Sequence, residues 1–122
     1  MIVVDSYGWI EYFADGPLSD KYQKYITNPE DILTPVIVVY EVYKKVKRER
    51  GEKAALVVLA HINQTNIVPL DETLAVKAAD VALEFKLPMA DAIVYATAIV
   101  KNRKVATSDP HFKKLPHVIF VE

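Results

Sequence analysis

The stretch 87–100 constrains the fold more than any other part of the chain, because between residues 89 and 100 it carries a single charge, Asp91. The other residues are apolar or small on every face of the helix that they predict, which is typical of a buried helix. A buried carboxylate is unfavourable unless a partner or a metal ion compensates it. Asp91 therefore either interacts with the free amides of the first helical turn after Pro88 or has a function.

Short apolar runs alternate along the chain with segments in which apolar residues recur at helical spacing. The runs predict strands at 2–4, 32–34, 67–70, 104–107 and 118–121, and the spacing predicts helices at 7–14, 18–27, 36–50, 52–63, 72–86 and 89–100, with a helical turn at 109–115. Apolar strands without strict alternation are typical of a parallel sheet with helices on both faces. We therefore predict a three-layer α/β fold with a central, mostly parallel sheet of about five short strands.

Individual residues predict where some of these elements begin and end. Ser6 is a candidate N-cap of the first helix, and Asp71 of the fifth. Gly51 is expected to end the long third helix. Pro69 lacks an amide hydrogen, so we expect the third strand to lie at an edge of the sheet or to end there.

Composition limits the classes of protein to which the chain can belong. A length of 122 residues with 52% hydrophobic residues suits a single domain, 1–122, with a substantial core. The absence of cysteine excludes disulfides and thiolate metal ligands and fits a cytoplasmic location. The apolar runs are too short to span a membrane, and the N-terminus lacks the basic segment of a signal peptide. With a net charge of −1, any nucleic acid must bind to local basic clusters.

Carboxylates fall at several points where a strand is followed by a helix. Asp5 follows the first predicted strand and Asp109 the fourth, while Glu41 lies early in the helix after the second strand. Asp91 lies in the first turn of the apolar helix. Because ligands of parallel α/β sheets bind at the carboxyl ends of the strands, we expect these side chains to share one edge of the sheet.

Each of these acids also has a purely structural explanation. Asp5 could cap the first helix, and Asp109 could begin a helical turn at the following proline. Glu41 could form a surface ion pair with Lys45, one helical turn later. The structural explanation is weaker for Asp5 and Asp91, because both lie in apolar surroundings where a serine or threonine would serve as a cap.

Carboxylates that meet at one edge repel one another, and this repulsion must be compensated. One pair of charges about 4 Å apart costs roughly 4 kcal/mol at an effective dielectric constant of about 20. A divalent cation removes this cost, and an all-oxygen donor set favours Mg²⁺ or Mn²⁺ over zinc. Such a site can polarise a phosphate, activate water and stabilise a leaving oxygen. No phosphate-binding loop or dinucleotide-binding glycine motif competes with this explanation, since the chain has only three glycines.

Several segments follow a familiar pattern in order: IVVDS (2–6), TPVIVVYEV (34–42), PLD (69–71), DAIVYATA (91–98) and TSDPHF (107–112). Together they resemble the PIN-domain family of small metal-dependent ribonucleases, and the similarity extends over essentially the whole chain. The commonest small members of that family are the toxins of VapBC-type toxin–antitoxin pairs. The chain differs from the family pattern at Tyr7, where small residues are frequent, and at His111, where many members carry a further acid.

This resemblance implies an activity, a metal site and partners. By it, the catalytic and metal-binding residues are Asp5, Glu41, Asp91 and Asp109, supported by the hydroxyl groups of Ser6 and Thr107. It also implies cleavage of single-stranded RNA by metal-activated water, inhibition by an antitoxin protein, and a homodimer. The leading hypothesis is therefore an Mg²⁺-dependent endoribonuclease, with Mn²⁺ as the alternative ion, that acts as the toxin of a type II toxin–antitoxin system.

Basic and aromatic side chains are candidates for contacts with RNA. Basic residues crowd the end of the third helix, and those favoured for RNA binding are Lys44, Lys45 and Arg48. The alternatives are a solvated helix end, where positive charge is favourable, and a surface that an acidic segment of an antitoxin covers. Tyr7, Trp9, Tyr12 and Phe13 could stack on bases, although aromatic residues at helical spacing are more typical of a core.

The histidines give weaker indications than the acids. His61 and His117 have no evident partner in the sequence and are expected to be structural or exposed. His111 could contact a leaving group.

Two other functions fit parts of the pattern. A non-catalytic or processing-type PIN module, binding RNA or protein in RNA maturation, would keep the fold and the basic cluster without requiring a metal ion. A receiver-type phosphoacceptor domain is also doubly wound, with acids at the ends of its strands. It expects paired acids after the first strand, however, and Asp5-Ser6 lacks that pair.

Overall fold

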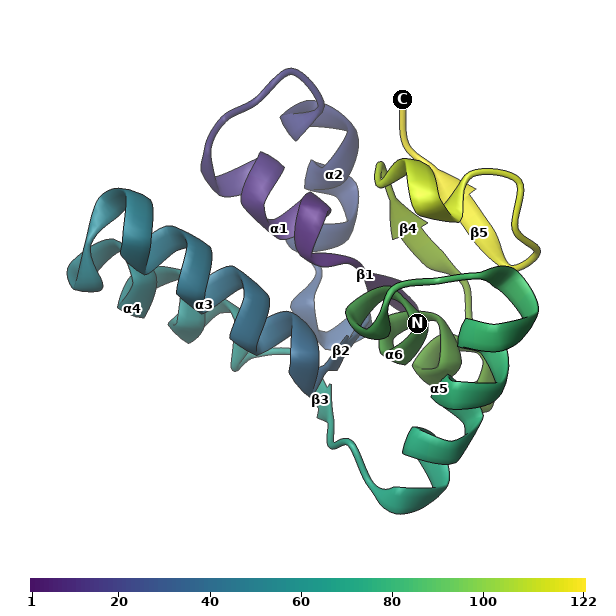
Figure 1. Ribbon diagram of the computed structural model, residues 1–122. Helices are drawn as coiled ribbons and strands as arrows, with labels where there is room; N and C mark the ends of the chain where they lie inside the picture. The colour runs from purple at the N-terminus through teal and green to yellow at the C-terminus, as the bar shows by residue number, and fades with distance from the viewer.

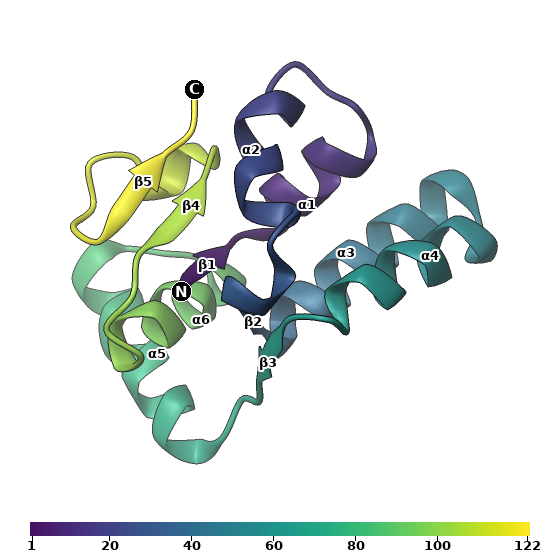
Figure 2. The same ribbon diagram turned by 180° about the vertical axis from the view of Figure 1, so that it is seen from behind.

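The computed structural model describes residues 1–122, which form a five-stranded parallel sheet with six α-helices around it (Figures 1 and 2). The strands are β1 (Ile2–Val4), β2 (Ile32–Pro35), β3 (Asn66–Val68), β4 (Val105–Thr107) and β5 (Val118–Phe120), in the spatial order β3-β2-β1-β4-β5. All neighbouring strands are parallel. The predicted α/β class with about five short strands is confirmed, and the carboxyl ends of all strands meet at one edge of the sheet.

The helices form three successive pairs whose members pack on each other. They are α1 (Ser6–Phe13) with α2 (Ser19–Ile26), α3 (Val36–Arg50) with α4 (Glu52–Ile62), and α5 (Glu72–Phe85) with α6 (Met89–Val100). Two short 3₁₀ turns, η1 (Pro29–Asp31) and η2 (Pro110–Phe112), complete the chain. The α3–α4 pair projects away from the sheet, whereas α6 contacts β1, β2 and β4, and α1 contacts β1 and β4 (Figure 1).

Helix α6 is the most deeply buried helix, as its apolar sequence predicts. Residues 92–98 are all buried, while the ends at Met89 and Val100 are exposed. Polar groups within this stretch have partners, since the Thr97 hydroxyl donates to the Ile93 carbonyl at 2.8 Å and the Tyr95 hydroxyl to the Pro116 carbonyl at 2.6 Å. Burial on all sides fixes the helix against the sheet and holds its first turn, with Asp91, at one end of the core.

Local signals for the ends of the elements are confirmed in two cases and wrong in one. Asp71 caps α5, because its Oδ1 accepts the Leu74 amide at 2.8 Å, and Gly51 ends α3 with a φ of 90°. The assignment of Ser6 as the first N-cap is wrong. Helix α1 begins at Ser6 itself, which puts Asp5 in the cap position, yet the Asp5 side chain makes no capping hydrogen bond.

The edge strands are shorter than the sequence predicts. Strand β3 ends at Val68, because Pro69 has no amide hydrogen with which to continue the pairing. Strand β5 ends at Phe120, although the Val121 amide still donates to the Thr107 carbonyl at 2.8 Å. No helix of the chain combines the length and the apolar character that crossing a membrane requires.

Gly8 is a position of close approach between α1 and its neighbours. A β-carbon at this position would lie 2.5 Å from the Tyr22 ring and 2.8 Å from Val4, and both of these neighbours are fully buried. We expect Gly8→Ala to lower the free energy of unfolding by about 1–3 kcal/mol, because overpacking outweighs the better helix propensity of alanine. Urea denaturation, followed by circular dichroism, measures this change.

Leu83→Ala is the control for Gly8→Ala, because the Leu83 side chain is 83% exposed. Shortening this side chain should change the free energy of unfolding by less than about 0.5 kcal/mol. A Gly8→Ala protein as stable as the wild type would mean that α1 and α2 separate without cost, contrary to the close packing described above.

Candidate metal centre

Asp5 and Asp109 follow two neighbouring strands, β1 and β4, and one hydroxyl group connects them. The Thr107 hydroxyl donates to Asp5 Oδ2 at 2.9 Å and accepts the Asp109 amide at 3.0 Å. Both carboxylates are buried, with relative exposures of 1% and 3%. The parallel pairing of β1 with β4 thus places two acids that are far apart in the sequence at the same edge of the sheet.

Asp91 reaches the same place from the first turn of α6. The Nδ1 atom of His111 lies 2.8 Å from Asp91 Oδ2 and 3.2 Å from Asp109 Oδ1, and the ligand atoms of the three residues all lie within 4.8 Å of one another. Asp109 also begins η2, because its Oδ1 accepts the His111 amide at 3.0 Å. The structural explanation of Asp109 as a helix start is therefore correct, and it coexists with the clustering.

Glu41 lies close enough to Asp5 and Asp109 for their charges to affect it, but outside the group of three residues whose ligand atoms cluster. Burial raises the pKa of Glu41, the negative charge of Asp5 raises it further, and the Ser6 side chain opposes the rise by hydrogen bonding. The proposed surface ion pair of Glu41 with Lys45 is wrong. Instead, the Lys45 Nζ atom lies 3.8 Å from Oε1 of Glu49, which is one turn further along the exposed face of α3.

Negative charge accumulates at this edge without a lysine or arginine to compensate it, since none of the five ion pairs of the chain joins such a residue to these acids. Burial raises the pKa of Asp5 to about 7, the Thr107 hydrogen bond opposes the rise, and Asp91 and Asp109 add to it. Burial and the charge of Asp109 raise the pKa of Asp91 to about 6, against the opposing effect of His111. Uncompensated carboxylates of this kind are what a cation would stabilise.

The donor set fits a divalent metal ion. Asp5, Glu41, Asp91 and Asp109 offer carboxylate oxygens, the ligands that Mg²⁺ and Mn²⁺ prefer. Two of these carboxylates, those of Asp91 and Asp109, lie close enough together for both to contact the same atom, His111 Nδ1. Among the predicted ligands, Asp91 and Asp109 belong to the group whose ligand atoms lie within 4.8 Å of one another, whereas Asp5 and Glu41 lie outside it.

His111 contacts two of the acids of this site, which the sequence did not indicate. Pro110 begins η2, and the turn brings the histidine back over the Asp109 carboxylate. That local contact could have been inferred from the Asp-Pro-His order. The contact with Asp91 could not, because it joins two segments that only the packing of α6 against the sheet brings together.

The aromatic residues of α1 divide between the core and the site. Trp9 is fully buried and stacks on Phe13 with ring centroids 6.2 Å apart, and Tyr12 packs edge-on against Phe13 at 5.2 Å. These residues belong to the core, as their helical spacing favoured. Tyr7 is 47% exposed, and partial burial together with the charges of all four acids raises the pKa of its phenol, so its ring stands beside the acidic cluster.

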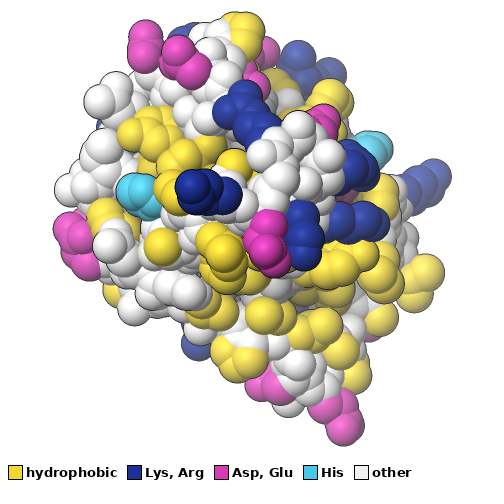
Figure 3. All heavy atoms as spheres, turned by 90° about the vertical axis from the view of Figure 1, so that its left-hand side faces the viewer, with side chains coloured by type: hydrophobic (Ala, Val, Ile, Leu, Met, Phe, Trp, Pro, Cys, Tyr) yellow, Lys and Arg dark blue, Asp and Glu magenta, His cyan; other side chains and the backbone are white.

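The other histidines and the basic residues also take definite positions. His61 packs against Phe13 with ring centroids 5.1 Å apart. Lysine and arginine side chains gather beside exposed apolar side chains on the face formed by the end of the α3–α4 pair (Figure 3). Of the residues predicted to bind RNA, Lys44 donates to the Tyr40 hydroxyl at 3.2 Å, Arg48 forms no ion pair, and Lys45 borders a hollow that Glu41 also lines.

Fold and site together define an α/β protein with an acidic cluster at the carboxyl edge of a parallel sheet. The sequence pattern of the PIN domain family matches residues 2–118, and the chain belongs to this family. No curated protein sequence matches the chain significantly.

Solved structures with the same fold include toxin–antitoxin proteins. A toxin–antitoxin complex from Klebsiella pneumoniae has a TM-score of 0.80 at 22% identity, and the alignment covers 98% of this chain and 96% of the chain in that structure. VapC20 from Mycobacterium tuberculosis, described as a sarcin-ricin loop cleaving toxin, has a TM-score of 0.73 at 18% identity, with coverages of 86% and 87%. DNA-bound VapBC from Salmonella typhimurium has a TM-score of 0.76 at 14% identity, with coverages of 98% and 95%. At these identities the likeness concerns the fold.

The raised pKa of Asp5 predicts how the stability of the metal-free protein depends on pH. Because the folded-state pKa is about 7 against an ordinary value of 3.8, the folded protein binds this proton more tightly than the unfolded chain does. The resulting stabilisation is complete below about pH 4 and is lost as the pH rises through about 7. We therefore expect the free energy of unfolding in EDTA to fall over this range, by at most about 1.4 kcal/mol per pH unit for this group.

Mg²⁺ should reverse the trend, because it binds the deprotonated carboxylates. Denaturation in Mg²⁺ and in EDTA should therefore differ more at about pH 8 than at about pH 5. Asp5→Asn, which cannot ionise at this position, should lose the part of this dependence that Asp5 contributes, while the raised pKa values of Asp91 and Glu41 preserve the rest. Equal stability of the EDTA-treated wild type at both pH values would contradict the prediction.

Proposed function

We propose that the protein is an Mg²⁺-dependent endoribonuclease that cleaves single-stranded RNA and acts, in the cytoplasm, as the toxin of a toxin–antitoxin pair. The observation that carries the proposal is the convergence of Asp5, Asp91 and Asp109 at the sheet edge with no lysine or arginine to neutralise them. The family and the fold of the toxin–antitoxin structures described above support it.

Each side chain would have a distinct part in the reaction. A divalent cation supplies the chemistry by polarising the phosphodiester and making water a better nucleophile. Asp91 from α6 and Asp109 after β4 would hold it, together with the carboxylates of Asp5 and Glu41. Thr107 holds the Asp5 carboxylate in place, and Ser6 does the same for Glu41.

Basic residues next to the acids would hold the RNA backbone. Glu41 and Lys45 line one hollow, so a phosphate bound to Lys45 would lie close to the acidic site. Arg48 lies one helical turn further along α3 and is free of carboxylate partners. Lys44 would contribute less, because its ammonium group already lies over the Tyr40 ring at 5.3 Å from the centroid.

An RNA cleavage assay with a single-stranded substrate tests the proposal. The wild type should cleave in Mg²⁺ and not in EDTA, and Asp5→Asn and Asp91→Asn should each lower kcat/KM by about two orders of magnitude or more, because each removes a charge that would bind the metal ion. Thermal denaturation checks that the variants are folded.

Asp71→Asn is the matched control, since Asp71 caps α5 and an asparagine cap preserves the hydrogen bond to Leu74. Its activity should equal that of the wild type. Cleavage that persists in both Asp5→Asn and Asp91→Asn, or that is unaffected by EDTA, would defeat the proposal.

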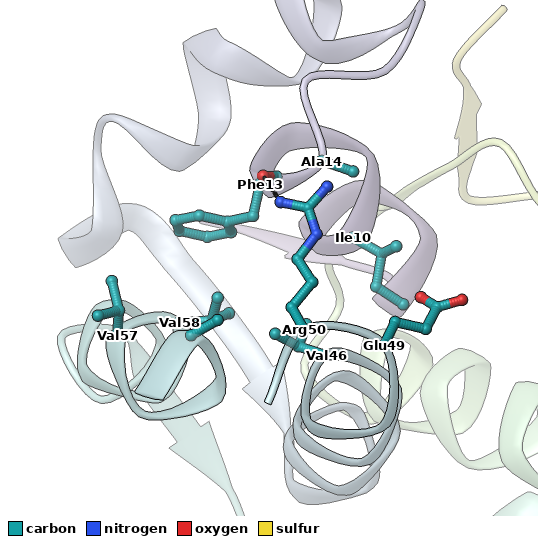
Figure 4. A pocket seen from close by; sticks show the side chains of 9 residues that line it. Ile10, Phe13, Ala14, Val46, Glu49, Arg50, Val57 and Val58 are labelled. Atoms are coloured by element: carbon teal, nitrogen blue, oxygen red, sulfur yellow. Dashed lines mark hydrogen bonds between the residues drawn. The ribbon is translucent and has the colours of Figure 1, made fainter. Parts of the chain in front are cut away.

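An antitoxin partner is supported by a groove between α1 and the α3–α4 pair (Figure 4). Its walls are mostly apolar, and Arg50 extends across it and donates to the Phe13 carbonyl at 3.4 Å. Val57 lines the groove although it is 54% exposed. An antitoxin segment with apolar side chains and a flanking acid would fit these walls, and co-purification with the product of the neighbouring gene tests this pairing.

A homodimer is supported by a second apolar hollow, of about 430 Å³, between α5 and α6. All its lining residues are apolar, and among them Met89 is 74% and Leu70 41% exposed. Met89 is two residues from Asp91, so a second copy of the chain at this hollow would bring two acidic sites close together. We expect the wild type to sediment as a dimer and Met89→Lys as a monomer, because a charge at the interface opposes burial. A monomeric wild type would contradict this part of the proposal.

A non-catalytic PIN module that binds RNA is the second candidate. The observation in its favour is the contact of His111 with Asp91 and Asp109, which partly satisfies both carboxylates without a metal ion. Calorimetry separates the two functions. Binding of Mg²⁺ favours the nuclease, whereas RNA binding without any Mg²⁺ binding favours the module.

A further inference from the structure

We infer that the hollow beside the acidic cluster, lined by Ser6, Tyr7, Ile10, Glu11, Glu41 and Lys45, holds one nucleotide of the RNA with its base stacked on the Tyr7 ring. The inference rests on the proposed function, because it assigns a substrate position next to the same acids. It makes Tyr7 a substrate-binding residue that fixes which phosphodiester reaches the acids.

Tyr7 is an exposed aromatic side chain at a point where its sequence neighbours are buried. It is 47% exposed, whereas Asp5, Ser6 and Trp9 are exposed by 5% or less. Its ring forms no aromatic pair and its hydroxyl no hydrogen bond, in contrast to Trp9, Tyr12 and Phe13, which pack on one another. An aromatic face left free beside a candidate phosphodiester site is what base stacking requires.

The charges around the hollow favour a base over a second phosphate. Glu41 and Glu11 contribute two carboxylates and Lys45 one ammonium group. Glu11 is held in place, because its Oε1 accepts the Leu18 amide at 3.0 Å. A ligand with several phosphates would meet repulsion here, whereas an uncharged base with one phosphate at Lys45 would not.

The size of the hollow agrees with a single nucleotide. Its volume is about 410 Å³, within the range of pockets that hold small ligands. Ser6 and Glu41 belong both to this hollow and to the surroundings of the acidic cluster, so a nucleotide bound here would have its neighbouring phosphodiester at the acids.

The experiment measures RNA binding in the Asp91→Asn background, where cleavage does not interfere. Fluorescence anisotropy follows a short single-stranded RNA and a series of copies, each with one base removed. We expect removal of one particular base to weaken binding about tenfold, and Tyr7→Leu to weaken binding of the intact RNA by a similar factor. The two changes together should cost no more than either alone, because they remove the same contact.

Matched variants separate stacking from other effects. Tyr7→Phe keeps the ring and should bind as the Tyr7 protein does, while Leu83→Ala removes an exposed apolar side chain of α5 and should change nothing. Unchanged binding by Tyr7→Leu, or full additivity with every base removal, overturns the inference even if the wild type is a nuclease. A Tyr7-dependent penalty at one base supports it even if the wild type cleaves no RNA.

Discussion

Buried carboxylates without a lysine or arginine partner are the feature on which the carboxyl edge of the sheet depends. Asp5 and Asp109 are almost completely buried, and the Thr107 hydroxyl lies between them as a donor to one side chain and an acceptor for the other residue's amide. These hydrogen bonds offset only part of the desolvation that raises the pKa of Asp5 to about 7. The edge therefore keeps an excess of negative charge that favours the binding of a cation.

Strand pairing and the packing of α6 bring the acidic side chains together at the edge of the sheet. Parallel pairing puts β1 beside β4, so two strand ends deliver acids to one place. Helix α6, buried over residues 92–98, holds Asp91 at its exposed end, where the carboxylate reaches His111. The apolar contacts of α6 with three strands provide the rigidity that positioned carboxylates require, because packed cores leave side chains few alternative rotamers.

Helix α1 packs into the core with one face and lies beside the acidic cluster with the other. One face supplies Trp9 and Phe13 to the core, and close packing at Gly8 fixes the helix against β1 and α2. The other face presents Ser6 to Glu41 and leaves Tyr7 exposed beside the acids. Because one face of α1 is packed rigidly against the core, the helix can hold the Tyr7 ring in a fixed position on its other face. The packing that stabilises the fold would therefore also position the ring that we propose binds RNA.

The sequence alone determined the class of fold, the helices and strands within a few residues, and the acids at their junctions. Apolar periodicity and turn residues act locally, so Gly51 and Asp71 could be assigned in advance. Only the tertiary structure decided the strand order, the contact of His111 with Asp91, and the partner of Lys45. Backbone hydrogen bonds between strands are alike for any sequence, and periodicity says which face is buried but not which distant side chain meets it.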